Sequence, residues 1–162
     1  MRVAVITSSD SGYEGKREDL SGPVIEKMVT EAGYQVVSKV ILPDDRKMLE
    51  AELARIADAG EADLILTTGG TGFSPRDVMP EATLAVAERM VPGIPEAMRA
   101  YSLQFTKRTM LSRAASGIRK RTLIVNLPGS PKAVRECLEY ILPQLDHGLK
   151  ILLGLDGECA RK

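Results

Sequence analysis

Two kinds of hydrophobic pattern alternate along the chain. Short runs rich in branched apolar residues are typical of buried strands, and they lie at 2–7, 35–42, 63–68 and 122–126. Between these runs, apolar residues recur at spacings of three and four, as they do in amphipathic helices. The second pattern predicts helices at about 21–32, after 43–45, from Pro80, from Pro95 and from Ser130 to about 154.

Strands that alternate with helices predict the α/β fold class. We expect a single three-layer domain with a mostly parallel sheet covered by helices on both faces. Ser21 is predicted to cap the first helix, and Gly33 is predicted to end it in the left-handed conformation. The last residues, about 155–162, are predicted to form a frayed tail.

Length and composition narrow the class of protein. The chain has 162 residues, the length of one domain, so 1–162 is predicted to be a single domain. No apolar run approaches the ~18 residues of a membrane span, and the first residues lack the pattern of a signal peptide. The two cysteines, Cys137 and Cys159, form neither a disulfide framework nor a metal cluster. These features predict a cytoplasmic protein without a membrane partner.

The formal net charge is zero, but the charges are unevenly distributed. No acidic residue lies between Glu96 and Glu136, and this segment is rich in lysine and arginine. A basic segment in a neutral protein favours an anionic small ligand over nucleic acid. Aromatic residues make up only 4%, which argues against a stacking platform for single-stranded nucleic acid. Each basic residue taken alone is better explained as part of a solvated helix face.

Polar or glycine-rich segments follow all of the predicted strands. In open α/β sheets, ligands bind beyond the carboxyl ends of the strands, so these segments are predicted to meet at one edge. They are Thr7-Ser8-Ser9-Asp10, Pro43-Asp44-Asp45, Thr67 to Asp77 and Asn126 to Pro131.

Gly69-Gly70-Thr71-Gly72 is the most informative of these segments. Positions without side chains let backbone N–H groups approach a phosphate and form an anion nest. The segment is neither the phosphate loop of nucleoside triphosphatases nor the spaced glycine pattern of dinucleotide-binding folds. A plain turn between strand and helix explains the glycines equally well. The charged pair Arg76 and Asp77 beside it favours a binding site.

Asp44 and Asp77 each allow two interpretations. Either residue can make a capping contact at a helix start, and near Asp44 the cap can equally be Asp45. Alternatively, each carboxylate holds a divalent ion, since Mg²⁺ bound to substrate phosphates takes only one or two protein carboxylates. Arg113 can clamp a phosphate with its guanidinium, and the helix start at Ser130 offers N–H groups to an anion. The single histidine, His147, gives a Ser-His-Asp apparatus weak support.

Together these segments resemble the molybdopterin adenylyltransferase family, the MogA/MoaB-type proteins of molybdenum cofactor biosynthesis that are related to a domain of gephyrin. The likeness covers about 2–153. Its most specific part is the Thr-Gly-Gly-Thr-Gly block at 68–72 together with Pro75-Arg76-Asp77 and with Asn126-Leu127-Pro128-Gly129-Ser130-Pro131. Met79 departs from the family, which commonly has Thr there. Because Met cannot accept a capping bond, we expect a helix start weakened by about 1 kcal/mol.

The resemblance implies a trimeric nucleotidyltransferase. It would use Mg²⁺ and the substrates ATP and molybdopterin to make adenylylated molybdopterin and pyrophosphate, and a downstream molybdate-inserting enzyme is a further expected partner. The metal that is later inserted into the product would be molybdenum, or tungsten in some organisms. Asp44 and Asp77 are carried over as the essential acids, expected to be catalytic and to hold Mg²⁺. Substrate and phosphate contacts are expected from Ser9, Asp10, Thr68, Gly69, Gly70, Thr71, Gly72, Arg76, Ser112, Arg113, Pro128, Gly129 and Ser130.

The expected chemistry suits this set of residues. A terminal phosphate with a second pKa of ~6 is a nucleophile that needs no strong general base. Positioning and charge neutralisation should dominate, with basic residues between Arg99 and Arg121 contributing to the latter. Two alternatives stay open. One is a non-catalytic molybdopterin- or nucleotide-binding module of the same fold. The other is nucleic-acid binding by the basic segment, which the zero net charge disfavours.

Overall fold

The computed structural model describes residues 1–155, and most of the predicted frayed tail, 156–162, lies outside the described residues. One six-stranded sheet has the order β2-β1-β3-β6-β5-β4. Its four parallel strands are β1 (Arg2–Ser8), β2 (Gln35–Leu42), β3 (Leu64–Thr68) and β6 (Thr122–Leu127). Beside β6, the short strands β5 (Ser116–Arg119) and β4 (Arg89–Met90) pair in antiparallel fashion. The predicted, mostly parallel sheet is therefore confirmed.

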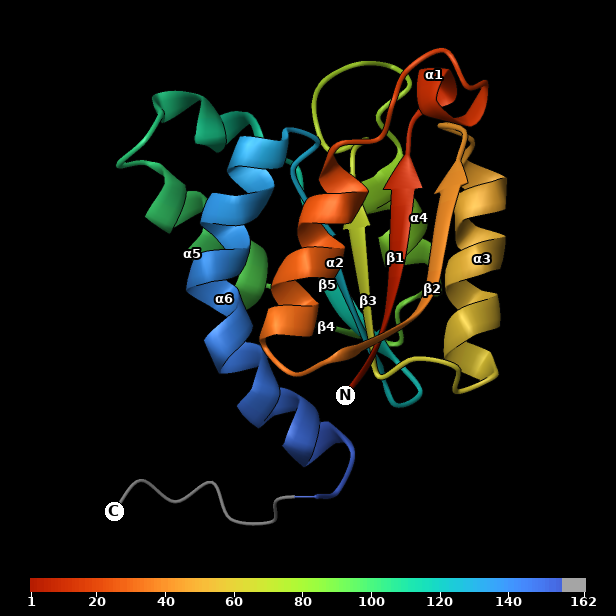
Figure 1. Cartoon of the computed structure of the whole chain (residues 1–162), viewed down its shortest axis with the longest axis vertical. Coiled ribbons are helices and arrows are strands. Elements are labelled where there is room, and N and C mark those ends of the chain that lie inside the picture. Colours follow the sequence, from red (N-terminus) through yellow and green to blue (C-terminus); the bar gives the residue numbers. More distant parts are fainter. Residues whose placement is uncertain (156–162) are drawn as a thin grey trace.

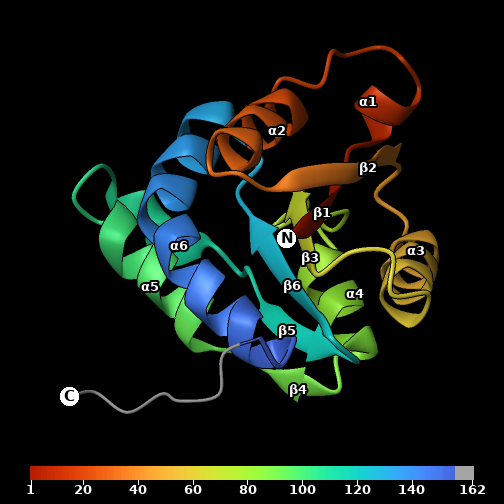
Figure 2. The ribbon, with the colours of Figure 1, turned by 60° about the horizontal axis from the view of Figure 1, so that its bottom comes forward.

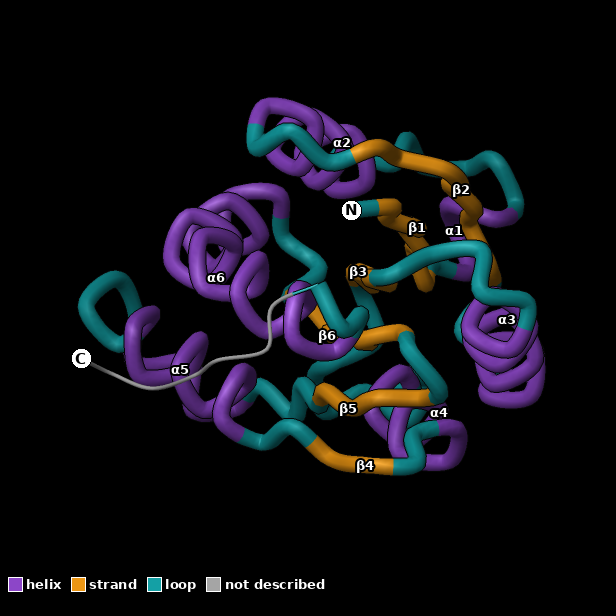
Figure 3. Tube along the Cα trace, turned by 90° about the horizontal axis from the view of Figure 1, so that it is seen from below, coloured by secondary structure: helices purple, strands orange, loops and turns teal. Residues whose placement is uncertain are grey.

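Helices cover both faces of the sheet, which confirms the three-layer prediction (Figures 1 and 2). One face carries α2 (Ser21–Glu31), α5 (Gly93–Ser102) and α6 (Pro131–Leu152), and the other carries α3 (Arg46–Asp58) and α4 (Met79–Val86). The same separation is visible from below in Figure 3. Two short helices, α1 (Asp10–Tyr13) and the 3-10 helix η1 (Lys107–Leu111), lie in connecting segments. Within 1–155, no helix combines the length and apolarity that crossing a membrane requires.

The alternation of side chains along β1 divides the core into two halves. Val3 and Val5 pack with α2 and α6, whereas Ala4 and Ile6 pack with α3 and α4. All four side chains are completely buried. Successive residues of a strand point to opposite faces, so a continuous apolar run is the expected sequence for a strand covered on both sides. The core therefore fixes the register of the strands whose carboxyl ends carry the candidate site.

The prediction missed β4 and β5, which are short and lack an apolar run. Both residues of β4 are exposed, and β5 begins with Ser116 and Gly117. A Cβ added at Gly117 would lie 2.6 Å from the Ala87 Cβ and 3.0 Å from the Arg89 carbonyl oxygen. Glycine is required there because the chains approach closely, which is a tertiary constraint rather than a local strand signal.

Helix starts differ from the prediction in two places. At α2, Ser21 is not the cap; instead Asp19 Oδ1 accepts the N–H groups of Ser21 and Gly22 at 3.0 and 2.9 Å. At α4, the N-cap is Val78 and Met79 is the first helical residue. Met79 is completely buried in the half of the core that α3 and α4 cover. The expected weakening of this helix start by Met79 is therefore wrong, since the residue is not at the capping position and stabilises the core instead.

Candidate functional site

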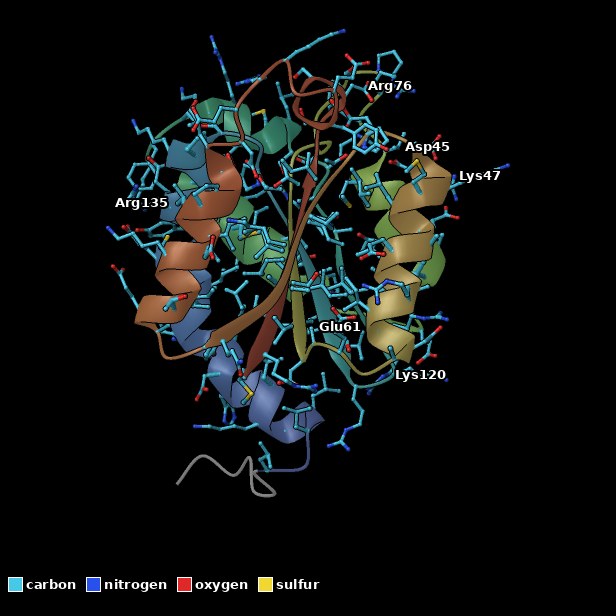
Figure 4. All side chains as sticks on the ribbon, turned by 45° about the vertical axis from the view of Figure 1, so that its right-hand side comes forward. Asp45, Lys47, Glu61, Arg76, Lys120 and Arg135 are labelled. Atoms are coloured by element: carbon cyan, nitrogen blue, oxygen red, sulfur yellow. The ribbon has the colours of Figure 1, made fainter. Side chains whose placement is uncertain are left out.

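A cavity of about 400 Å³ opens beyond the carboxyl ends of the parallel strands, and we call it the aspartate cavity. Its walls come from the end of β1, the segment after β2, the turn after β3 and the starts of α2 and α6. Of the predicted site residues, those that line it are Ser9, Asp44, Thr68, Gly69, Gly70, Asp77, Gly129 and Ser130. Figure 4 shows this end of the molecule with Asp45 and Arg76, and the opposite end with Lys120 and Glu61.

The turn after β3 depends on glycine. Gly69 and Gly70 have φ values of +89° and +65°, a region that favours glycine. A Cβ at Gly69 would lie only 2.3 Å from the Ser8 carbonyl oxygen, and one at Gly70 would lie 3.6 Å from Asp44 Oδ1. The absence of side chains therefore lets this turn pack against the end of β1 and beside Asp44.

Asp44 is held by the segment that follows β1. Its Oδ1 accepts a hydrogen bond from Ser8 Oγ at 2.5 Å, and its Oδ2 accepts the Asp10 N–H at 3.1 Å. In return, Asp10 Oδ1 accepts the Asp44 N–H at 2.9 Å. Asp45 is the N-cap of α3, since its Oδ1 accepts the Met48 N–H at 2.9 Å. Of the two interpretations, Asp45 therefore caps the helix and Asp44 faces the cavity.

Asp77 enters the cavity from the loop between β3 and α4. Its Oδ2 accepts the N–H of Ser74 at 2.8 Å. The loop also passes close to this carboxylate at Gly72, where an added Cβ would lie 2.9 Å from Oδ2. Within 1–155, no group of three or more His, Cys, Asp and Glu side chains is placed to hold a metal ion. Asp44 and Asp77 thus line the same cavity as Glu18 and Asp19 without forming such a group.

Arg76 pairs with Asp10 at the rim and does not line the aspartate cavity. Its Nε and Nη2 donate to the two carboxylate oxygens of Asp10 at 3.0 and 2.9 Å. The hydrogen bond from Arg76, followed by that from the Asp44 N–H, lowers the pKa of Asp10. Asp10 is likewise not among the residues that line this cavity. Two residues expected to contact phosphate are therefore engaged with each other.

Arg113 is engaged with protein groups in a similar way. Its guanidinium donates to the carbonyl oxygens of Gly72 and Asp77 at 2.7 and 2.6 Å and forms an ion pair with Glu81. Burial raises the pKa of Glu81, but the hydrogen bond and the charge of Arg113 outweigh this effect and lower it overall. Arg113 lines neither the aspartate cavity nor the neighbouring one described next.

A second cavity of about 280 Å³ lies on the other side of the glycine turn. Its lining includes four further predicted site residues, Thr71, Gly72, Ser112 and Pro128. Its other walls include Met98, Leu111 and Cys137, with the basic residues Arg99 and Arg108. The glycine turn and the start of α6 thus separate two adjoining hollows at the carboxyl edge of the sheet.

The expected contribution of basic residues up to Arg121 is wrong for the last part of the segment. Arg119 ends β5 and forms an ion pair with Asp58, and Lys120 and Arg121 form the turn that precedes β6. That turn lies at the amino end of β6, away from the site (Figure 4). Because β5 runs antiparallel to β6, the same basic segment reaches both ends of the sheet.

Some cavity residues were not among the predicted contacts. Ser8 lies at the end of β1, Asp19 and Ser21 lie at the start of α2, and Arg17 is a basic residue of the same wall. Ser21 Oγ donates to the Gly129 carbonyl at 2.7 Å, which ties the start of α2 to the segment before α6. Ser8 had a usable signal in the sequence, which is its place at a strand end.

The fold and the paired carboxylates define an α/β protein with a site built on strand ends. Residues 4–147 match a family model described as "Probable molybdopterin binding domain", and the chain belongs to this family. It is 39% identical over 161 residues to a molybdopterin adenylyltransferase of Helicobacter pylori strain J99, covering 95% of this chain and 89% of that protein. Its identity to the Escherichia coli K12 protein of the same name is 42% over 144 residues, covering 87% and 73% of the two chains.

Solved structures give a concordant result. The molybdopterin biosynthesis enzyme MoaB from Thermus thermophilus superposes with a TM-score of 0.89 at 44% identity, over 94% of this chain and 96% of that chain. The tungsten cofactor synthesizing protein MoaB from Pyrococcus furiosus gives a TM-score of 0.85 at 35% identity, over 93% and 96%. The predicted fold and family are both confirmed.

Proposed function

We propose that this protein adenylylates molybdopterin with Mg-ATP, in the biosynthesis of the molybdenum cofactor or of its tungsten counterpart. One observation carries the proposal: Asp44, Asp77 and the Gly69–Gly70 turn line the same cavity at the carboxyl edge of the sheet. Relatives about 40% identical to this chain are named molybdopterin adenylyltransferases, which supports the same reaction.

The charges of the aspartate cavity suit a divalent cation. Among residues 1–155, four acidic residues line it, Glu18, Asp19, Asp44 and Asp77, together with one basic residue, Arg17. A triphosphate alone would meet a wall of its own sign, so a bridging cation is needed for it to bind. Carboxylate oxygens are the ligands that Mg²⁺ takes beside substrate phosphates, and one or two of them suffice. We therefore assign Mg²⁺ to Asp44 and Asp77, where it would neutralise negative charge on the triphosphate.

Backbone N–H groups are the proposed phosphate contacts. The N–H groups that open α2 are not available, because Asp19 accepts those of Ser21 and Gly22. The first turn of α6 is less occupied, since Ser130 Oγ accepts only the Ala133 N–H, at 3.5 Å. We infer that α6 and the Gly69–Gly70 turn hold phosphate oxygens, because a helix N-terminus and a glycine turn both present donors to anions.

In the proposed reaction, a terminal phosphate oxygen of molybdopterin attacks the α-phosphorus of ATP. A new phosphorus–oxygen bond forms, the bond from the α-phosphorus to the β-bridging oxygen breaks, and pyrophosphate leaves with the electron pair. The attacking phosphate is mostly dianionic at neutral pH, so no side chain has to remove a proton. The cavity residues act by aligning two anions and by offsetting their repulsion.

The test is incubation of the purified protein with molybdopterin, ATP and Mg²⁺. Adenylylated molybdopterin and pyrophosphate should appear in equal amounts, and chelation of Mg²⁺ should stop their formation. Tight binding of molybdopterin without either product would reject catalysis and would instead support a binding module.

We further propose a homotrimer in the cytoplasm that passes its product to a molybdate-inserting enzyme. Light scattering tests the subunit number, and a labelled-product transfer assay tests the hand-over.

A further inference from the structure

The loop that carries Asp77 is exposed in its middle. Residues 73–76 are all exposed, and Phe73 is 70% exposed. Inside the loop, the Asp77 N–H donates to the Ser74 carbonyl at 2.9 Å, and the Asp77 carboxylate accepts the Ser74 N–H. These bonds fix the shape of the turn but not its place relative to the rest of the molecule. Contacts from outside the loop must therefore set where the Asp77 carboxylate lies.

Arg76 joins the exposed middle of the loop to Asp10, and Arg113 supplies contacts at both of its ends. The Arg113 backbone N–H donates to the Thr71 carbonyl at 2.9 Å, and Arg113 Nε donates to the Gly72 carbonyl at 2.7 Å. At the other end, Nη2 donates to the carbonyl of Asp77 itself at 2.6 Å, while Nη1 pairs with Glu81 in the first turn of α4. One side chain thus joins the start of the loop, its end and the following helix.

We propose that Arg113 is a positioning residue that acts on the metal site through Asp77, and that it does not contact phosphate. This inference rests on the proposed function, in which Asp77 holds Mg²⁺. The charge of Arg113 is already paired with Glu81, and its guanidinium lines neither cavity. The planar fork of arginine reaches both carbonyl oxygens and the carboxylate at once, which the single ammonium of lysine cannot do.

The test compares Arg113→Lys with a matched control, Arg119→Lys. Arg119 also joins a backbone carbonyl, that of Val86, to a carboxylate, that of Asp58, but at the other end of the sheet. Loss of a residue that orients a metal ligand costs about 10–100-fold in metal affinity or activity. We expect Arg113→Lys to lower turnover by about that factor, while Arg119→Lys stays near wild type.

Metal affinity gives a readout that does not depend on turnover. Mn²⁺ replaces Mg²⁺ as the probe, its binding is followed by electron paramagnetic resonance, and a non-hydrolysable ATP analogue is present throughout. Arg113→Lys should weaken Mn²⁺ binding about 10-fold in the wild-type background and should cause no further loss in the Asp77→Asn background. Affinity for the analogue without metal should be the same with and without Arg113→Lys.

Three results would overturn the proposal. The first is unchanged Mn²⁺ affinity in Arg113→Lys. The second is an equal loss of affinity in the Asp77→Asn background, which would show that Arg113 does not act through Asp77. The third is weaker metal-free binding of the analogue, which would indicate direct contact with phosphate. If Arg113→Lys fails to fold, Glu81→Gln removes the ion-pair partner of the guanidinium and is measured in the same way.

The Mn²⁺ measurements also separate this proposal from the proposed function. If the wild-type protein binds Mn²⁺ with the analogue but forms no adenylylated product, the proposed function fails, while Mn²⁺ binding still decides the role of Arg113.

Discussion

Asp44 and Asp77 face the same cavity, but the molecule holds them in different ways. Both oxygens of Asp44 accept hydrogen bonds, from Ser8 Oγ and from the Asp10 N–H, so its carboxylate is part of the contact between the ends of β1 and β2. Asp77 accepts one bond from its own loop, and that loop is joined to the fold by Arg113 at its ends and by the Arg76–Asp10 pair at its middle. We infer that Asp44 contributes to both structure and chemistry, whereas Asp77 contributes mainly to chemistry.

The largest expected effect is on turnover and is shared by the two aspartates. Asp44→Asn and Asp77→Asn should each lower the rate of adenylylation by about 10²–10³-fold, as loss of a group that stabilises transition-state charge does. Molybdopterin binding should largely survive in Asp77→Asn. A steady-state assay for pyrophosphate, combined with calorimetric binding of molybdopterin, measures both. Near-normal turnover of Asp77→Asn would discard its assignment to the metal.

The glycine turn between the two aspartates should give the next largest effect, on folding stability. Gly69→Ala forces a side chain into a positive φ and places its Cβ 2.3 Å from the Ser8 carbonyl. We expect a loss of about 1–3 kcal/mol, or more if the turn cannot shift. Gly33→Ala is the matched control, because Gly33 has a φ of +84° with no atom within 4 Å of the added Cβ. Equal loss in the two variants, by chemical denaturation, would show that the close approach of Gly69 to β1 is unimportant.

Asp44→Asn and Asp77→Asn should differ in folding stability. Asparagine keeps one acceptor oxygen, so Asp77→Asn can still accept the Ser74 N–H. In Asp44→Asn the oxygen can accept the Asp10 N–H while the NH₂ donates to Ser8 Oγ, so two charge-assisted bonds become neutral, compared with one in Asp77→Asn. The free energy of unfolding should therefore fall by about 1 kcal/mol in Asp44→Asn and by less in Asp77→Asn. Urea denaturation of both proteins measures the difference. A larger loss in Asp77→Asn would contradict the contrast drawn between the two sites.

The smallest effect is expected at the rim, where Arg76 pairs with Asp10. The hydrogen bond from Arg76 lowers the pKa of Asp10 in the folded protein. A carboxylate with a lowered pKa stabilises the fold above its unfolded pKa, about 3.9, and loses this contribution as the pH falls through the folded value. Arg76→Ala should therefore reduce stability slightly at pH 7 and not at acid pH. Denaturation curves at both pH values check this, and a difference independent of pH would contradict it.

Sequence patterns predicted the parts of the fold that local residues determine. The bounds of β2 match the prediction, and Gly33 has the predicted left-handed conformation after α2. The strands β4 and β5 were missed because they are short and carry no apolar run. The role of Met79 was also mispredicted, because its place in the core depends on the packing of α4 against α3 and the sheet.

The candidate site divides in the same way. The rule that ligands bind beyond strand ends was enough to predict that Asp44, Asp77 and the glycine turn lie at one edge of the sheet, where they line one cavity. It could not predict what the arginines do, because their partners are distant in sequence. Asp10 and Arg76 are 66 positions apart, and Arg113 and Glu81 are 32 apart. The sequence therefore could not show that Arg76 and Arg113 already pair with carboxylates of the protein.

A crystal structure of the protein with Mg²⁺ and a non-hydrolysable ATP analogue would locate the proposed metal and phosphate contacts. We expect the triphosphate in the aspartate cavity, with Mg²⁺ between it and the carboxylates of Asp44 and Asp77, and with phosphate oxygens on N–H groups of the Gly69–Gly70 turn or the start of α6. A triphosphate bound elsewhere, with Mg²⁺ in contact with neither aspartate, would contradict this expectation.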